Sequence, residues 1–135
     1  MTADLTVQKA LRARLVGTAG VTDLVPASSI LDRNARPNPD PAIIMGEGQT
    51  YEADDIAREV TRVVMDLHVW KKEPSLAGVK AIAGAVRKAI HSSRLALDTG
   101  FHCGDCRVSM QRFLRDPDGE TSHAVVTVET IVREA

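Results

Sequence analysis

Aromatic side chains are scarce in this sequence: its 135 residues include one Trp, one Tyr and two Phe. Four aromatics, Tyr51, Trp70, Phe101 and Phe113, are too few for a platform on which the bases of a nucleic acid could stack. The formal net charge is −1, so the sequence also lacks the basic excess that is typical of phosphate-binding proteins. Both absences argue against a protein that recognises nucleic acid.

Long apolar runs are absent as well. No run reaches the roughly 18 residues that a membrane span requires. The N-terminal sequence MTADLTVQKALRARL lacks the apolar stretch and the cleavage site of a signal peptide. We therefore expect a soluble protein made in the cytoplasm, with no membrane partner. Its two cysteines are then expected to be free thiols rather than a disulfide.

Two segments have the periodicity of amphipathic helices. The first places Val7, Leu11 and Leu15 on one stripe and ends before Gly17. A short helical turn is predicted over 22–25. The second helix has Pro74 in its first turn, and its apolar stripe consists of Leu76, Val79, Ala83, Val86 and Ile90.

The remaining segments predict a sheet. Strands are expected over 29–31, 42–46, 58–71 and 95–98, and segment 34–41, with three prolines, is expected to be irregular. A closing hairpin begins at Arg107, and its turn reads Asp116-Pro117-Asp118-Gly119, which suits a type I turn. The elements predict one domain over 1–135 of the α+β class. Two helices would pack on one face of a mostly antiparallel sheet of four to five strands.

The strand over 58–71 has two different faces. Val63, Met65, Leu67 and Val69 alternate along it and form the face predicted to lie in the core. The opposite face ends with Trp70, the largest apolar side chain of the sequence. We expect Trp70 to pack either in the core or at a subunit interface, where Trp is a common anchor.

Cys103-Gly104-Asp105-Cys106 has the CxxC spacing of zinc-binding and redox-active thiols, and His102 precedes it. A tetrahedral zinc site needs four ligands, and no second CxxC is present. A redox pair is expected at the start of a helix, whereas a strand is predicted to follow this motif. The four histidines are scattered and suggest no pair of nucleophile and base. We expect no metal, no cofactor and no catalytic residue, with a small CxxC redox or metal protein as the less favoured alternative.

The segment 46–57 is the main candidate contact. It contains four acidic residues and no basic residue, and it is longer than a turn between neighbouring strands requires. We expect a loop that is mobile in the free protein and ordered at a subunit contact through Tyr51, Glu52, Asp54 and Asp55. Its basic partners on the neighbouring subunit would be Lys9, Arg12 or Arg14. The alternative is a solvated loop that contacts nothing.

Several stretches, taken in order, resemble one known family. They are ALRARLVGTAGVTDLV with SSILDR, then DPAIIMGEG, then VVMDLHVWKKEPSLAGVKAIAGAVRKAIHSSRLAL, then RFLRDPDGETSHAVVTVETIV. The most specific parts are HVW and the RDPDG turn with its following histidine. Across nearly the whole chain, this order resembles the tail-completion, or tail-terminator, proteins of long-tailed phages and related gene-transfer particles.

The resemblance implies a structural role and no enzyme activity. Members of the family form a hexameric ring at the head-proximal end of the tail tube, in the neck of the particle. The ring ends tube polymerisation, contacts the tail tube protein and offers a surface to the head-side connector or stopper protein. DNA passes through its lumen without specific binding. A homo-oligomer in a virion or virion-like particle, assembled in the host cytoplasm, is therefore implied; the other candidate is a different ring component of the same particle, such as a head-side connector.

Overall fold

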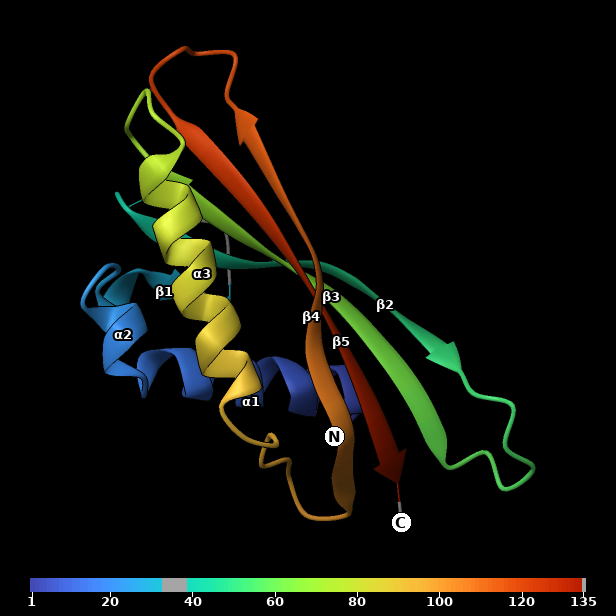
Figure 1. The fold of residues 1–135 in the computed structure, drawn as a ribbon. Helices are drawn as coiled ribbons and strands as arrows, with labels where there is room; N and C mark the ends of the chain where they lie inside the picture. Colours follow the sequence, from blue (N-terminus) through green and yellow to red (C-terminus); the bar gives the residue numbers. More distant parts are fainter. Residues whose placement is uncertain (33–38, 135) are drawn as a thin grey trace.

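A five-stranded sheet with helices on one of its faces forms the fold of this protein (Figure 1). The computed structural model describes residues 1–32 and 39–134. Its elements are α1 (Ala3–Val16), α2 (Ala19–Thr22), a 3-10 helix (Ala27–Ser29), β1 (Ile30–Leu31), β2 (Ala42–Glu52), β3 (Val60–Lys71), α3 (Ala77–His91), β4 (Phe101–Arg115) and β5 (Ser122–Glu134).

The strands follow the order β1-β2-β3-β5-β4 across the sheet. β1 is parallel to β2, and the other neighbouring pairs are antiparallel. β4 and β5 form the predicted closing hairpin, and a hydrogen bond of 3.0 Å from Gly119 N to Asp116 O closes its turn. The predicted α+β class, with helices on one face of a mostly antiparallel sheet, is confirmed.

The core lies between the helices and the sheet. The predicted apolar face of β3 is buried there: Val63, Met65, Leu67 and Val69 are at most 4% exposed. The two amphipathic helices bury their apolar stripes against this face, and these stripes are the ones that the sequence predicts. Their fully or almost fully buried side chains are Val7, Leu11, Leu15, Val79, Ile82, Ala83, Val86, Ala89 and Ile90.

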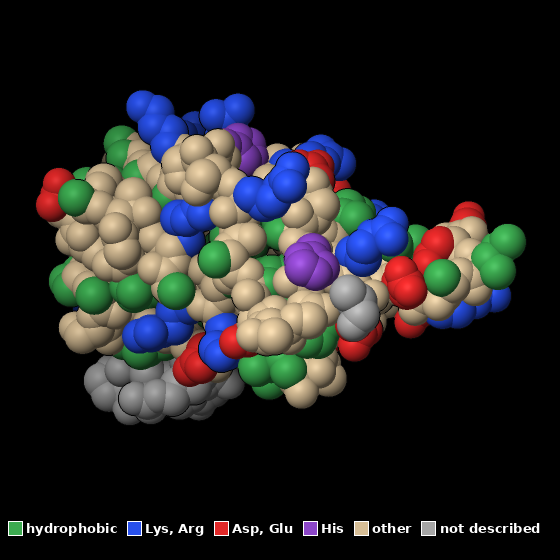
Figure 2. Space-filling model, turned by 90° about the horizontal axis from the view of Figure 1, so that it is seen from below, with side chains coloured by type: hydrophobic (Ala, Val, Ile, Leu, Met, Phe, Trp, Pro, Cys, Tyr) green, Lys and Arg blue, Asp and Glu red, His purple; other side chains and the backbone are tan. Residues whose placement is uncertain are grey.

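The predicted boundary between a strand over 42–46 and a loop over 46–57 is wrong. β2 starts where predicted but continues to Glu52, because beyond a register shift between Met45 and Gly48 it pairs again with β3, from Gly48 opposite Met65 to Glu52 opposite Thr61. Only residues 53–59 remain as a connection. The candidate contact segment is therefore the end of a long β-hairpin that projects from the body (Figures 1 and 2).

Three smaller predictions also differ from the structure. The helical turn predicted over 22–25 begins earlier, as α2, because Thr18 O accepts hydrogen bonds from Val21 N and Thr22 N. Segment 95–98 is not a strand: Asp98 is held by α1, because its carboxylate accepts hydrogen bonds from Thr6 Oγ1 and Lys9 Nζ. β4 begins at residue 101, so the CxxC motif lies within a strand. The proline-rich segment lies mostly outside the described residues.

No helix in the described ranges combines the length and the apolar character that crossing a membrane would demand.

Candidate functional site

The predicted contact residues lie on a hairpin arm, which we define as residues 48–64. Tyr51 is on β2 and 42% exposed. The Arg62 guanidinium lies over its ring at 4.4 Å from the centroid, and Gln49 Nε2 donates a hydrogen bond of 2.9 Å to its hydroxyl. Glu52 is exposed at the end of the same strand. The arm therefore offers an aromatic side chain and a carboxylate from a strand, not from a loop.

The arm tip, residues 53–59, is a turn organised by Asp55. Asp55 Oδ2 accepts a hydrogen bond of 2.7 Å from Glu59 N, and Asp55 O accepts one of 3.3 Å from Arg58 N. The bond from Glu59 N holds the pKa of the Asp55 carboxyl below its ordinary value. Arg58 has a positive φ of 57°, which the turn imposes. Asp55 thus serves the turn, whereas Asp54 is exposed; mobility of the tip in the free protein stays a prediction.

The basic residues proposed as partners of the arm all have partners within their own chain. Lys9 Nζ lies 3.0 Å from Asp98 Oδ1, and Arg12 Nε donates a hydrogen bond of 2.9 Å to Ile30 O. Arg14 donates five hydrogen bonds to the C-terminal end of α3 and the residues after it. A subunit-interface role for Arg12 and Arg14 stays a prediction, but the structure gives each of them an internal structural role.

Trp70 lies on the sheet face away from the helices, in a cluster that we call the outer-face cluster: Glu47, His68, Trp70 and His123. β3 and β5 place Trp70 opposite His123, and their rings stack with centroids 3.7 Å apart and planes 6° apart. His68 Nδ1 is 2.8 Å from His123 Nε2, and His68 Nε2 is 2.6 Å from Glu47 Oε1. The core alternative for Trp70 is wrong, and its interface role stays a prediction.

Two groups of the outer-face cluster, Glu47 and His123, have a lowered pKa. The bond from His68 lowers the pKa of the Glu47 carboxyl, so Glu47 is ionised at neutral pH. His68 Nε2 donates to Glu47 Oε1, and in the contact between His68 Nδ1 and His123 Nε2 one ring nitrogen donates and the other accepts. Burial, followed by the charge of His68, lowers the pKa of His123 to about 4. Gly46 is required beside this cluster because a Cβ there would overlap the His68 ring.

The low pKa of His123 predicts a loss of stability in acid. Between about 6.5, the pKa of an unfolded histidine, and about 4, the unfolded state binds more protons than the folded state, so the free energy of unfolding falls as pH falls. We expect the His123→Gln variant to lose about 4 °C less in Tm than the wild type between pH 7 and pH 5. Thermal melts followed by circular dichroism at each pH measure this difference.

The control for this prediction is His102→Gln, because His102 is an exposed histidine on β4. Its Tm should follow the wild-type pH dependence. Glu47, Asp116 and Arg112 also act on His123 electrostatically, so the melts are compared at constant ionic strength. Identical slopes for His123→Gln and the wild type would contradict the assignment.

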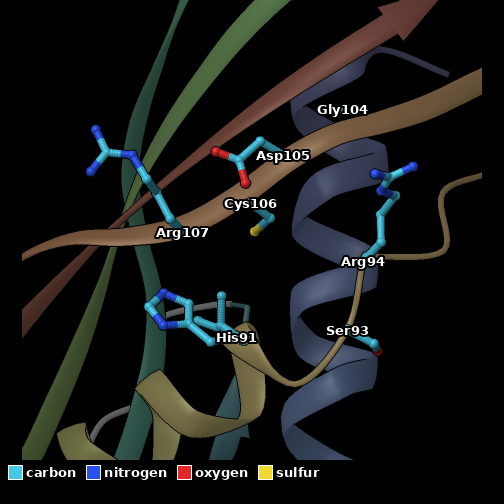
Figure 3. A pocket seen from close by; sticks show the side chains of 8 residues that line it. His91, Ser93, Arg94, Gly104, Asp105, Cys106 and Arg107 are labelled. Carbon is cyan, nitrogen blue, oxygen red and sulfur yellow. The ribbon is translucent and has the colours of Figure 1, made fainter.

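Cys106 borders a hollow of about 400 Å³ between β4 and the end of α3, whereas Cys103 is buried in the core. A register shift at Gly104 brings Cys103 and Cys106 to the helix side of the sheet. Figure 3 shows the Cys106 side chain pointing into the hollow and Asp105 and Arg107 pointing away from it. Burial raises the pKa of the Cys106 thiol to about 11, although Thr130 Oγ1 contacts its sulfur at 3.3 Å. His91 Nε2 accepts a hydrogen bond from Val108 N, so it does not serve as the base for this thiol.

We expect Cys106 to be unreactive in the folded protein. A thiol with a pKa of about 11 has a thiolate fraction roughly 100-fold below that of a free cysteine at pH 7.5. Alkylation of Cys106 by iodoacetamide in the folded protein, followed by mass spectrometry, should be slower by at least that factor than in the unfolded protein. The unfolded reference is prepared in about 8 M urea, which denatures small domains. Equal rates in both conditions would show an activated or exposed thiol and reopen the redox alternative.

The described part of the chain contains no group of three or more His, Cys, Asp or Glu side chains arranged to hold a metal ion. The absence of metal and of catalysis stays a prediction.

The sequence did not reveal two features of the structure. The outer-face cluster depends on the pairing of β3 with β5, which the spacing of two scattered histidines does not reveal. The second feature is Ile56, which is 98% exposed. Among the acidic residues of the arm tip, its sequence position gives no sign of a contact.

Residues 9–133 match the model of one protein family, described as tail completion protein gp17. Among curated proteins, none matches the sequence. A chain from the virion of a native gene transfer agent (GTA) particle is 18% identical, with a TM-score of 0.85 over 98% of this chain and 99% of the other. The gp17 protein of bacteriophage SPP1 is 21% identical, with a TM-score of 0.64 over 95% and 89% of the two chains. At these identities, the two structures establish a shared fold.

Proposed function

Because this chain belongs to the tail completion protein gp17 family, we propose that it forms a homo-oligomeric ring of six subunits that caps the head-proximal end of a tail tube. The family membership itself makes the chain a structural component of a phage or phage-like tail. The proposal adds that the ring ends tube polymerisation and joins the tail to the head. One observation carries it: the family match extends from residue 9 to residue 133, almost the whole chain.

The net charge and the surfaces of the chain support a ring that encloses DNA without binding it tightly. The net charge is −1, and tight neutralisation of phosphates requires an excess of Lys and Arg. The arm and the helical side of the molecule are different surfaces. A contact between two different surfaces is heterologous and generates a ring when its rotation closes.

The proposed partners are the tail tube protein on one side of the ring and the head-side connector or stopper protein on the other. We propose that the chain has no catalytic activity. The high pKa of the Cys106 thiol and the engagement of His91 with the backbone of β4 both support this, because neither provides an activated nucleophile.

The number of copies in each particle tests the proposed ring. Quantitative mass spectrometry of purified particles, calibrated against isotope-labelled peptides of this chain and of the tube protein, is expected to give six copies. One or two copies would contradict the ring, and hundreds would indicate a tube subunit. Labelling of a C-terminal tag in electron micrographs should mark the junction of head and tail and nowhere else along the tail.

A further inference from the structure

The arm tip displays one large apolar side chain, Ile56, on a hydrogen-bonded turn. Ile56 is 98% exposed, the highest exposure among the large hydrophobic residues of the described chain. The turn that carries it is defined by hydrogen bonds from Glu59 N to Asp55 Oδ2 and from Ala53 N to Val60 O at 3.1 Å. At this exposure the Ile56 side chain contributes nothing to the core of its own chain, and it is free to contact another molecule.

The surroundings of Ile56 are acidic. Residues 52–59 contain four carboxylates, Glu52, Asp54, Asp55 and Glu59, and one base, Arg58. Figure 2 shows the arm projecting from the body, with acidic side chains and a hydrophobic group towards its end. A partner surface should therefore be apolar at its centre and basic at its margin.

The same chain has a surface with those properties. A groove of about 610 Å³ runs along α3 beside the start of α2. We call it the α2–α3 groove. Its floor consists of small residues, among them Ala81, Gly84 and Ala85, and a Cβ built at Gly84 would meet nothing within 4 Å. The floor is thus open enough to receive a side chain from outside.

Two lysines border the α2–α3 groove. Lys80 and Lys88 both line it, and they lie eight positions, or about 12 Å, apart along the helix. Across residues 1–32 and 39–134, neither lysine takes part in an ion pair. Lys80 Nζ lies 5.4 Å from the centroid of the Phe113 ring, but both lysines are exposed, so their ammonium groups can still pair with carboxylates of a partner.

The arm and the α2–α3 groove of one chain cannot meet. Figure 1 shows the arm at the lower right, at the far end of the sheet from α2 and α3 on the left. Within one chain their complementarity in charge and in apolar character is not satisfied, whereas two copies of the chain can satisfy it. The same contact repeated from copy to copy is head-to-tail, as a ring requires.

We propose that the arm of one subunit inserts into the α2–α3 groove of the next subunit in the ring. Ile56 packs on the floor at Gly84 and Ala85, and Glu52 and Asp54 face Lys80 and Lys88. This inference rests on the proposed ring and adds the surfaces that close it. Such a contact combines a central apolar anchor with a charged margin, the usual arrangement of a protein interface.

Covalent trapping tests the contact directly. The double variant Ile56→Cys with Gly84→Cys, oxidised in assembled particles, should give a ladder of disulfide-linked oligomers on a denaturing gel that ends at the hexamer. Each single variant is the control for reactions with Cys103 and Cys106, and it should give no ladder. Six copies in each particle without a ladder from the double variant would overturn the arm contact while leaving the ring intact.

Charge reversal tests the margin of the same contact. Lys88→Glu and Ile56→Asp should each raise the dissociation constant of the oligomer at least about tenfold, as expected for loss of a contact anchor. Native mass spectrometry measures the oligomer, and purified particles show how much of each variant is incorporated. Combining Lys88→Glu with Asp54→Lys should restore a large part of the loss. Arg87→Glu, an exposed position on α3 outside the groove, is the matched control and should assemble normally.

The folded state of each variant is checked by its thermal melt, which should be unchanged because Ile56 and Lys88 are exposed. Normal rings from Ile56→Asp would overturn the inference. If such rings then failed to join heads or tubes, the arm would bind another virion protein instead. Copy numbers other than six in wild-type particles would contradict the proposed function, independently of these variants.

Discussion

Removal of this chain from a particle-producing strain is expected to leave filled heads and separate tails, with tails of abnormal length. A tube protein that polymerises on itself needs a cap to end it, and under the proposed function the same cap is the docking surface for the head. Electron micrographs of lysates should show joined particles falling to background. The length distribution of the tails should broaden from one narrow peak to a wide distribution.

Expression of the wild-type chain in trans is the control, and it should restore both joining and tail length. The two readouts separate two roles. Unjoined tails of normal length would indicate a head-side joining protein and not a cap. Normal joined particles in the deletion strain would refute the assignment to the junction altogether.

The faces of the long elements were predictable because burial leaves a period in the sequence. The alternation of Val63, Met65, Leu67 and Val69 predicted the buried side of β3, and these residues are buried. The apolar stripe of α3 likewise predicted which side of that helix meets the sheet. Each pattern is local, since it needs only the geometry of one strand or one helix.

The arm was not predictable in the same way. Gly46-Glu47-Gly48 and the following polar residues indicate a loop when they are read alone. In the structure, this stretch contains the register shift of β2. Polar residues suit the rest of β2 because, among the strands that the structure describes, only β3 pairs with it there. Its pairing is set by the register with β3, a long-range property that local composition does not contain.

The internal contacts of Arg12 and Arg14 could not be predicted for a related reason. Charge and exposure predicted Arg12 and Arg14 as partners of an acidic segment, yet a basic side chain on a helix can equally serve the end of another helix. The sequence contains no sign that α1 and α3 meet. The tertiary packing therefore decides between an internal and an external role, and for Arg14 this decision can be measured.

Replacement of Arg14 by Ala should lower the free energy of unfolding by about 2 kcal/mol, since its charge-assisted hydrogen bonds to backbone carbonyls are lost. Arg14 Nη1 donates to Ala89 O at 2.8 Å and to Ser93 O at 3.1 Å, and Nη2 donates to Arg94 O at 3.1 Å. These carbonyls lie at and beyond the C-terminal end of α3, where the helix leaves its last acceptors free and its dipole favours a cation. Urea unfolding of dilute protein, followed by circular dichroism, gives the change.

The choice of variants separates this internal role from a contact with another subunit. Arg87→Ala on the exposed side of α3 is the matched control, and it should change the free energy of unfolding by less than about 0.5 kcal/mol. Arg14→Lys should recover only part of the loss, because an ammonium group cannot span several acceptors as the planar guanidinium does. A residue that acts only between subunits would leave the unfolding of the dilute chain unchanged. If Arg14→Ala unfolds at the wild-type urea concentration but assembles poorly, Arg14 acts at the subunit contact and the internal role derived from its five hydrogen bonds is wrong.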